Sequence, residues 1–124
     1  MRVEPYVYFQ GRCEEALEFY REAIGADATV LARFEDKVAH AVLRIGDTTV
    51  LASDGQGAGK PDFSGFSLSL TVSDDAEAER LFSALSDEGN VQVPMAPTPF
   101  ASRLGLVADK FGVPWMVVSQ NATR

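Results

Sequence analysis

The feature that most constrains the fold of this 124-residue sequence is that its two halves follow the same order of elements. Each half reads as a strand, a helix and three further strands. At offsets of 64 and 66 positions, five residues recur: Glu15, Leu17, Gly25, Gly46 and Ser53 return as Glu79, Leu81, Gly89, Gly112 and Ser119. The identities and the shared order together predict an internal duplication of a βαβββ module. The alternative is that two unrelated stretches resemble each other by chance.

In the first half, residues 3–9 read as a strand because β-branched and aromatic side chains dominate them. A helix is expected over residues 13–24, where an apolar stripe repeats at helical spacing: Cys13, Ala16, Leu17, Tyr20 and Ile24. Gly25 suits the left-handed residue that ends many helices. Three more strands are expected over residues 29–34, 38–45 and 48–53.

In the second half, Asp74 with Glu77 three positions later resembles a capping box at the start of a helix. That helix is expected over residues 75–88, with Gly89 at its end. The four strands of this half are expected over residues 66–72, 91–95, 105–108 and 114–118.

One such module buries too little surface to be stable alone. The sequence therefore predicts a single α+β domain over residues 1–124, with module one over about 1–54, a glycine-rich linker over about 55–63 and module two over about 64–120. Side by side, the modules are expected to form an open, curled eight-stranded sheet with the helices on its outer face. Its concave face would be a cleft, which is a natural site for a small molecule.

The composition excludes several kinds of partner. The net charge of −7 argues against a nucleic-acid backbone or an anionic membrane surface. Cys13 is the only cysteine, which leaves no intrachain disulfide and no cysteine-based zinc site. No segment approaches the roughly 20 apolar residues of a membrane span, and the first residues lack a signal-peptide pattern, so a cytoplasmic location is expected.

Several runs resemble the PhnB-like branch of the glyoxalase/bleomycin-resistance/extradiol dioxygenase (vicinal oxygen chelate) superfamily. They cover nearly the whole chain in order, as residues 5–11, 15–20 with Gly25, 39–41 with 43–47, 53–54, 100–105 and 109–112 with Trp115. Ala101 is a departure, because many relatives carry tryptophan there. The resemblance implies the paired-module fold and commonly a homodimer. It does not imply one reaction, since the superfamily contains isomerases, dioxygenases, thiol transferases and metal-free binding proteins.

The resemblance also indicates where a metal would bind. Metal-using relatives place one ligand on the first and last strand of each module, and these positions fall here at Pro5, Val50, Ser67 and Met116. None offers the imidazole or carboxylate that a borderline or hard divalent ion prefers. We therefore expect no superfamily-type metal site and no cofactor. No glycine-rich nucleotide loop supports methyl transfer from S-adenosylmethionine.

Three polar side chains allow both functional and structural interpretations. His40, the only histidine, is a general base or ligand-orienting donor, or a strand residue bonded to a neighbour; strand parity leaves its face open. Arg103 is expected in a loop, where it clamps an anionic group or anchors the loop. Cys13, at a helix N-terminus, is expected to pack in the core rather than act as a nucleophile.

Aromatic residues suggest a cleft for a flat or apolar ligand. Phe9, Phe66, Phe100 and Trp115 either face such a cleft or pack in the core and in a dimer interface. Tyr6 and Tyr8 alternate with Pro5, so they are expected against the helices.

The sequence thus favours a metal-independent small-molecule-binding protein, with an enzyme using His40, Asp54 or Arg103 as the alternative. The candidate ligand-binding residues are Phe9, His40, Val50, Asp54, Ser67, Phe100, Arg103, Trp115 and Met116.

Overall fold

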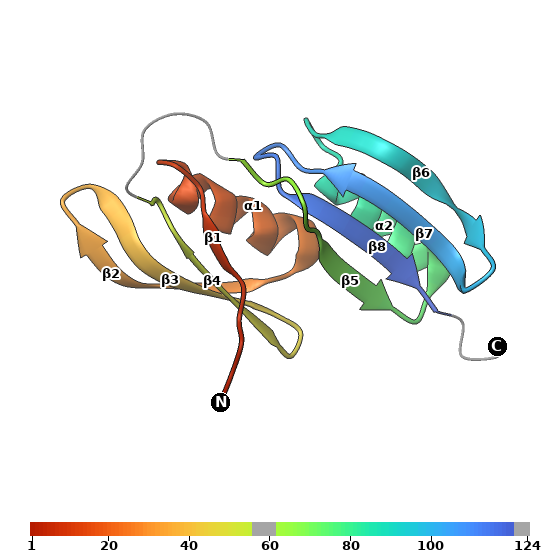
Figure 1. Ribbon diagram of the computed structural model, residues 1–124, viewed down its shortest axis with the longest axis horizontal. Helices are drawn as coiled ribbons and strands as arrows, with labels where there is room; N and C mark the ends of the chain where they lie inside the picture. The colour runs from red at the N-terminus through yellow and green to blue at the C-terminus, as the bar shows by residue number, and fades with distance from the viewer. Residues whose placement is uncertain (56–61, 121–124) are drawn as a thin grey trace. The chain divides into compact units, whose positions relative to one another are not determined.

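The computed structural model describes residues 1–55 and 62–120, and the chain divides into two compact units, Met1–Pro61 and Asp62–Arg124. The predicted strand–helix–three-strand order is confirmed in both units (Figure 1). The eight strands form two four-stranded open sheets, and the α+β class is as expected. Most of the expected linker, residues 56–61, lies outside the described residues.

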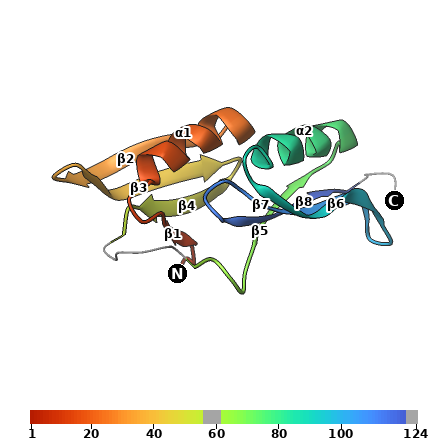
Figure 2. The same ribbon diagram turned by 90° about the horizontal axis from the view of Figure 1, so that it is seen from above.

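The first unit contains β1 (Tyr6–Tyr8), α1 (Cys13–Ile24), β2 (Asp27–Phe34), β3 (Lys37–Ile45) and β4 (Thr48–Ser53). Its sheet has the order β1-β4-β3-β2, with β1 parallel to β4 and the other pairs antiparallel. Helix α1 lies across one face of this sheet (Figure 2). Its buried stripe contains four of the five predicted residues, and Ala23 is buried where Ile24 was expected. Gly25 ends the helix in the left-handed conformation, as predicted.

The second unit contains β5 (Leu68–Val72), α2 (Asp75–Leu85), β6 (Asn90–Thr98), β7 (Ala101–Ala108) and β8 (Pro114–Ser119). The order β5-β8-β7-β6 repeats that of the first sheet, again with one parallel pair, β5 with β8. Helix α2 begins as the capping box predicts, because the Asp74 side chain accepts a hydrogen bond from the backbone N–H of Glu77 (3.1 Å). The helix covers one face of its own sheet (Figure 2).

The α2 face packs closely on β7. A β-carbon added to Gly105 would lie 2.7 Å from a ring carbon of Phe82 and 2.8 Å from the sulfur of Met95. Glycine is therefore required at this position to let the helix approach the sheet.

The prediction that α2 runs to residue 88 and ends at Gly89 is wrong. The helix stops at Leu85, and Ser86 caps it in a right-handed conformation while its hydroxyl donates to the carbonyl of Phe82 (2.7 Å). The left-handed turn residue that follows is Glu88. Glycine is needed at position 89 because a β-carbon there would lie 2.4 Å from the carbonyl oxygen of Ala108.

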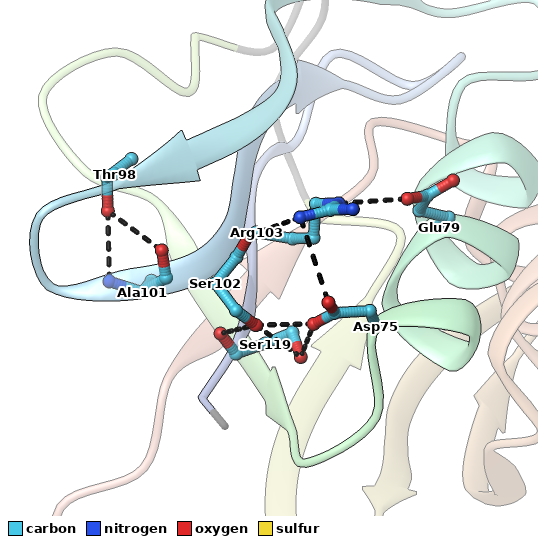
Figure 3. Close-up of polar contacts among 7 residues, drawn as sticks. All are labelled: Asp75, Glu79, Thr98, Ala101, Ser102, Arg103 and Ser119. Atoms are coloured by element: carbon cyan, nitrogen blue, oxygen red, sulfur yellow. Dashed lines mark hydrogen bonds and ion pairs between the residues drawn. The ribbon is translucent and has the colours of Figure 1, made fainter. Parts of the chain in front are cut away.

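The predicted loop before residue 105 is also wrong, since β7 already begins at Ala101. The β6–β7 connection is a tight turn in which the Thr98 hydroxyl accepts from the backbone N–H groups of Phe100 (3.3 Å) and Ala101 (3.0 Å; Figure 3). Arg103 consequently lies within a strand. Among the described residues, no helix is long and apolar enough to cross a membrane.

Candidate functional site

Strand pairing assigns the side chains of the first sheet to a helix-covered face and an open face. Leu43 lies opposite Val50, and they are 2% and 4% exposed, which identifies the helix-covered face. Successive strand residues point to opposite sides. The adjacent pair, Val42 with Leu51, therefore belongs to the open face.

Tyr6, Tyr8 and His40 lie together on this open face. Tyr6 pairs with Leu51, and its hydroxyl is 3.0 Å from Nδ1 of His40. The Tyr6 and Tyr8 rings are stacked, with centroids 4.8 Å apart and 24° between their planes. The contact with Tyr6 settles the face of His40, which the sequence left open.

The expectation that Tyr6 and Tyr8 pack against the helices is wrong. Tyr6 and Tyr8 do alternate with Pro5, as expected. However, Pro5 is in step with Phe9, which faces the helix, and not with the open face. Phe9 is 3% exposed, and its ring lies 6.2 Å from that of Tyr20 on α1. Tyr8, by contrast, is 49% exposed.

A depression of about 1040 Å³ lies beside the two tyrosines. Its aromatic lining is Tyr6, Tyr8 and Phe34, and its polar lining includes Gln10, Lys37 and Ser53. All of these residues belong to the first unit. We refer to this group of six residues as the tyrosine face.

Phe34 and Lys37 reach the tyrosine face because the β2–β3 pairing has two register shifts around Ala32. Beyond these shifts, Val38 is 2% exposed, and its partner Arg33 forms an ion pair with a carboxylate of α1, so this pair faces the helix. The next pair, Phe34 with Lys37, points to the open side. Bulges of this kind often redirect side chains beside functional sites.

Asp54, a candidate ligand residue, instead fastens the fold. It is 6% exposed, and its carboxylate accepts hydrogen bonds from the backbone N–H groups of Cys13 (2.8 Å) and Val38 (2.7 Å). Arg12, at the N-cap of α1, provides no side-chain cap, so Asp54, the residue after β4, fulfils that role. Cys13 is fully buried, and this burial, with the nearby Asp54 carboxylate, raises the pKa of its thiol to about 12.

Arg103 lies against α2 rather than in an open loop (Figure 3). Its guanidinium donates to Glu79 (3.0 Å), lies 3.7 Å from Asp75, and also donates to the carbonyl of Ser102 (2.7 Å). Asp75 accepts from the hydroxyls of Ser102 and Ser119, and these bonds hold the pKa of its carboxyl below the usual value. Arg103 is therefore already bound to carboxylates and is not positioned as an anion clamp.

The other second-unit candidates are dispersed. Trp115 is 2% exposed, and its indole N–H donates to the buried carboxylate of Asp109 (2.9 Å). Phe100 is 62% exposed in the β6–β7 turn. Ser67 precedes β5 and is exposed, while Met116 is half-buried on the side of β8 opposite Trp115.

The donor set on the open face of the first sheet does not suit a metal ion. Val50, where the resemblance placed a ligand, faces the helix. Its open-face neighbours on β4 are Thr49, Leu51 and Ser53, and β1 contributes only tyrosines. No group of three or more His, Cys, Asp or Glu side chains in residues 1–55 and 62–120 is arranged to hold a metal.

Of the nine sequence candidates, only His40 lies next to the tyrosine face, through its contact with Tyr6. The residues that line the depression were missed or assigned to the other side. The spacing of Tyr6 and Tyr8 places them on one face of the strand, but the sequence does not show which face of the sheet that is. No local sequence pattern predicts the bulges that turn Lys37 toward the open face.

Comparison with known proteins supports the family. A family model described as 3-demethylubiquinone-9 3-methyltransferase matches residues 1–118. Protein YjdN of Escherichia coli (strain K12) is 31% identical over 147 aligned residues, covering 100% of both chains. The chain belongs to this PhnB-like family.

Solved structures agree with this membership. Protein PA1353 from Pseudomonas aeruginosa is 37% identical, with a TM-score of 0.87 and 98% of each chain covered. A putative 3-demethylubiquinone-9 3-methyltransferase, PhnB protein, from Bacillus cereus is 22% identical, with a TM-score of 0.84 over 96% of this chain and 99% of that one. The fosfomycin resistance protein FosX from Listeria monocytogenes shares the vicinal oxygen chelate fold at 8% identity, with a TM-score of 0.72 over 99% and 94% of the chains.

Proposed function

We propose that this PhnB-like protein is a metal-independent small-molecule-binding protein and that the tyrosine face is its binding site. The observation that carries this proposal is the depression lined by Tyr6, Tyr8 and Phe34, of which Tyr8 and Phe34 are 49% and 70% exposed. Exposed aromatic rings gathered on a hollow surface are typical of ligand sites, because ring burial contributes binding free energy.

An unmet acceptor supports the same location. Oε1 of Gln10 is buried and has no hydrogen-bond partner among the described residues. A buried acceptor left without a donor is unfavourable by about 1–3 kcal/mol. A ligand or a water molecule with an N–H or O–H group could satisfy it.

The alternative is an enzyme, and one observation favours it. The Tyr6 hydroxyl and the His40 imidazole are hydrogen-bonded, and such a pair can take up or deliver a proton beside a bound ligand. The description of the family names methyl transfer, and FosX was solved with Mn(II) and a phosphonic acid. The open-face positions of β1 and β4 carry tyrosine, threonine, leucine and serine instead of metal-ligating carboxylates and imidazoles, which favours binding over metal-assisted catalysis.

A thermal-shift screen of small molecules tests the proposal. A ligand that binds only the native state raises stability by about 2.7 kcal/mol at 100 times its dissociation constant. We expect Tyr8→Ala to abolish the shift. Phe100→Ala, which removes an exposed ring from the second unit, should leave it intact. Equal shifts in both variants would contradict the location.

The metal part of the proposal has its own test. After chelator treatment, the protein offered zinc, nickel, manganese or iron(II) should retain less than one equivalent tightly, because His40 alone gives weak coordination. A stoichiometric ion held by three or more protein side chains would contradict metal independence and favour the enzyme alternative.

We also propose that the protein is a homodimer, on the basis of its family resemblance. Light scattering at micromolar concentration should then give about twice the chain mass of 13.4 kDa. A single species at the monomer mass would contradict this. The cytoplasmic location stays a prediction.

A further inference from the structure

The tyrosine face has a distinctive charge. Among residues 1–55 and 62–120, Lys37 is the only charged side chain that lines the depression. No carboxylate lies within ion-pair distance of its ammonium group in residues 1–55 and 62–120. The chain as a whole carries a net charge of −7, so a hollow that presents the unpaired cation of Lys37 differs in charge from the molecule around it.

The backbone places this cation beside an aromatic surface. Phe34 and Lys37 are direct cross-strand partners, and such partners have β-carbons about 4.5–5.5 Å apart. The two register shifts in the β2–β3 pairing are what bring this pair to the side of Tyr6 and Tyr8. Strict alternation from the helix-facing residue Ala41 would have turned Lys37 toward α1.

We propose that the ligand of the tyrosine face is a flat aromatic molecule that carries a carboxylate. The aromatic part lies against the exposed rings of Tyr8 and Phe34, and the carboxylate pairs with the ammonium of Lys37. This inference rests on the proposed binding function and specifies the chemical class of its ligand. A neutral aromatic molecule would leave Lys37 unpaired, and an aliphatic acid would leave the rings uncovered.

Ser53 can add a second contact to the carboxylate. Its hydroxyl oxygen accepts from the backbone N–H of Gly55 (3.2 Å), which leaves the hydroxyl hydrogen available to donate. Glu35 and Asp36, in the turn between Phe34 and Lys37, are exposed and do not line the depression. Their charges weaken the attraction to an anion, so the Lys37 contribution is modest and sensitive to salt.

Three probes separate the two parts of the proposal: 2-naphthoate, its neutral counterpart 2-naphthamide, and the non-aromatic acid cyclohexanecarboxylate. Titration followed by amide NMR shifts gives both an affinity and a location. We expect 2-naphthoate to bind most tightly and to shift signals of Tyr8 and Phe34. The other two probes should bind at least about threefold more weakly.

Charge variants on one strand give the matched comparison. Lys37→Gln should weaken 2-naphthoate binding by about three- to tenfold and leave 2-naphthamide unchanged. Arg44→Gln removes the same charge from the open face of β3, but seven residues and therefore roughly 23 Å away, and should change neither affinity by more than about twofold. Folding of each variant is checked by its melting temperature.

The outcomes distinguish this inference from the function on which it rests. If both naphthalene probes bind the tyrosine face equally and Lys37→Gln changes nothing, the binding site stands and the acidic ligand class is wrong. If Lys37→Gln and Arg44→Gln weaken 2-naphthoate equally, the effect is one of net charge and the inference is likewise overturned. If no probe at millimolar concentration shifts the tyrosine-face signals, while other small molecules stabilise the protein elsewhere, the proposed location fails as well.

Discussion

Replacing Asp54 with alanine should destabilise the protein strongly, because its carboxylate satisfies two buried backbone donors at once. The N–H of Cys13 lies in the first turn of α1, and the N–H of Val38 lies near the start of β3. Each buried donor left unsatisfied is unfavourable by about 1–3 kcal/mol. We therefore expect Asp54→Ala to lower the free energy of unfolding by about 2–5 kcal/mol.

Asp74→Ala provides the comparison, because Asp74 caps α2 through one exposed hydrogen bond. Losing such a cap typically lowers stability by about 1 kcal/mol. Urea unfolding followed by far-ultraviolet circular dichroism measures both variants, and faster exchange of the Cys13 and Val38 amides locates the Asp54 effect. If Asp54→Ala is no more destabilising than Asp74→Ala and instead abolishes ligand binding, the structural role assigned to Asp54 is refuted.

Three further predictions follow from individual contacts. Because burial raises the pKa of the Cys13 thiol to about 12, native protein at pH 8 should resist iodoacetamide until urea unfolds it. The free energy of unfolding should also fall as pH rises from about 9 toward 12, because the thiol ionises in the unfolded state before it does so in the native state. The two serine hydroxyls lower the pKa of Asp75, so they stabilise the fold above its ordinary pKa, and this contribution is lost as pH falls. Asp75→Asn should therefore reduce the dependence of the free energy of unfolding on pH in the acid range. An unchanged pH dependence would contradict this. Gly105→Ala should lower the free energy of urea unfolding by about 1–3 kcal/mol through the clash with Phe82, whereas an unchanged midpoint would mean that the helix moves away freely.

Much of the fold could be predicted from the sequence because its signals are local. The apolar stripe of α1, the Gly25 end and the Asp74–Glu77 start are each set by residues within one or two turns. The misjudged end of α2 shows the limit of such signals. Gly89 looked like a helix terminator, but it is required by the approach of a carbonyl from β7, which is a contact across 19 positions of sequence.

The candidate site was harder to predict because it depends on which face of a sheet each side chain occupies. Assigning Pro5 to the open face placed Tyr6 and Tyr8 on the helix-covered face, because a shift of one residue exchanges the two faces of a strand. Lys37 was missed because only the register shifts near Ala32 turn it outward. Such bulges arise from pairing between strands, and the β2 and β3 sequences show no glycine that would mark them.

The two units fasten the helix to the last strand in opposite ways, and this difference bears on where a ligand can bind. In the first unit, Asp54 beyond the end of β4 reaches the start of α1; in the second, Asp75 at the start of α2 reaches Ser119 at the end of β8. The second arrangement also recruits Arg103, so the cation of that unit's helix face is neutralised within the fold. In the first unit, Asp54 holds the start of the helix through the backbone N–H of Cys13, and Lys37 is exposed beside the aromatic rings. Because Lys37 is exposed beside aromatic rings whereas Arg103 is paired with carboxylates, we place the proposed site on the first unit.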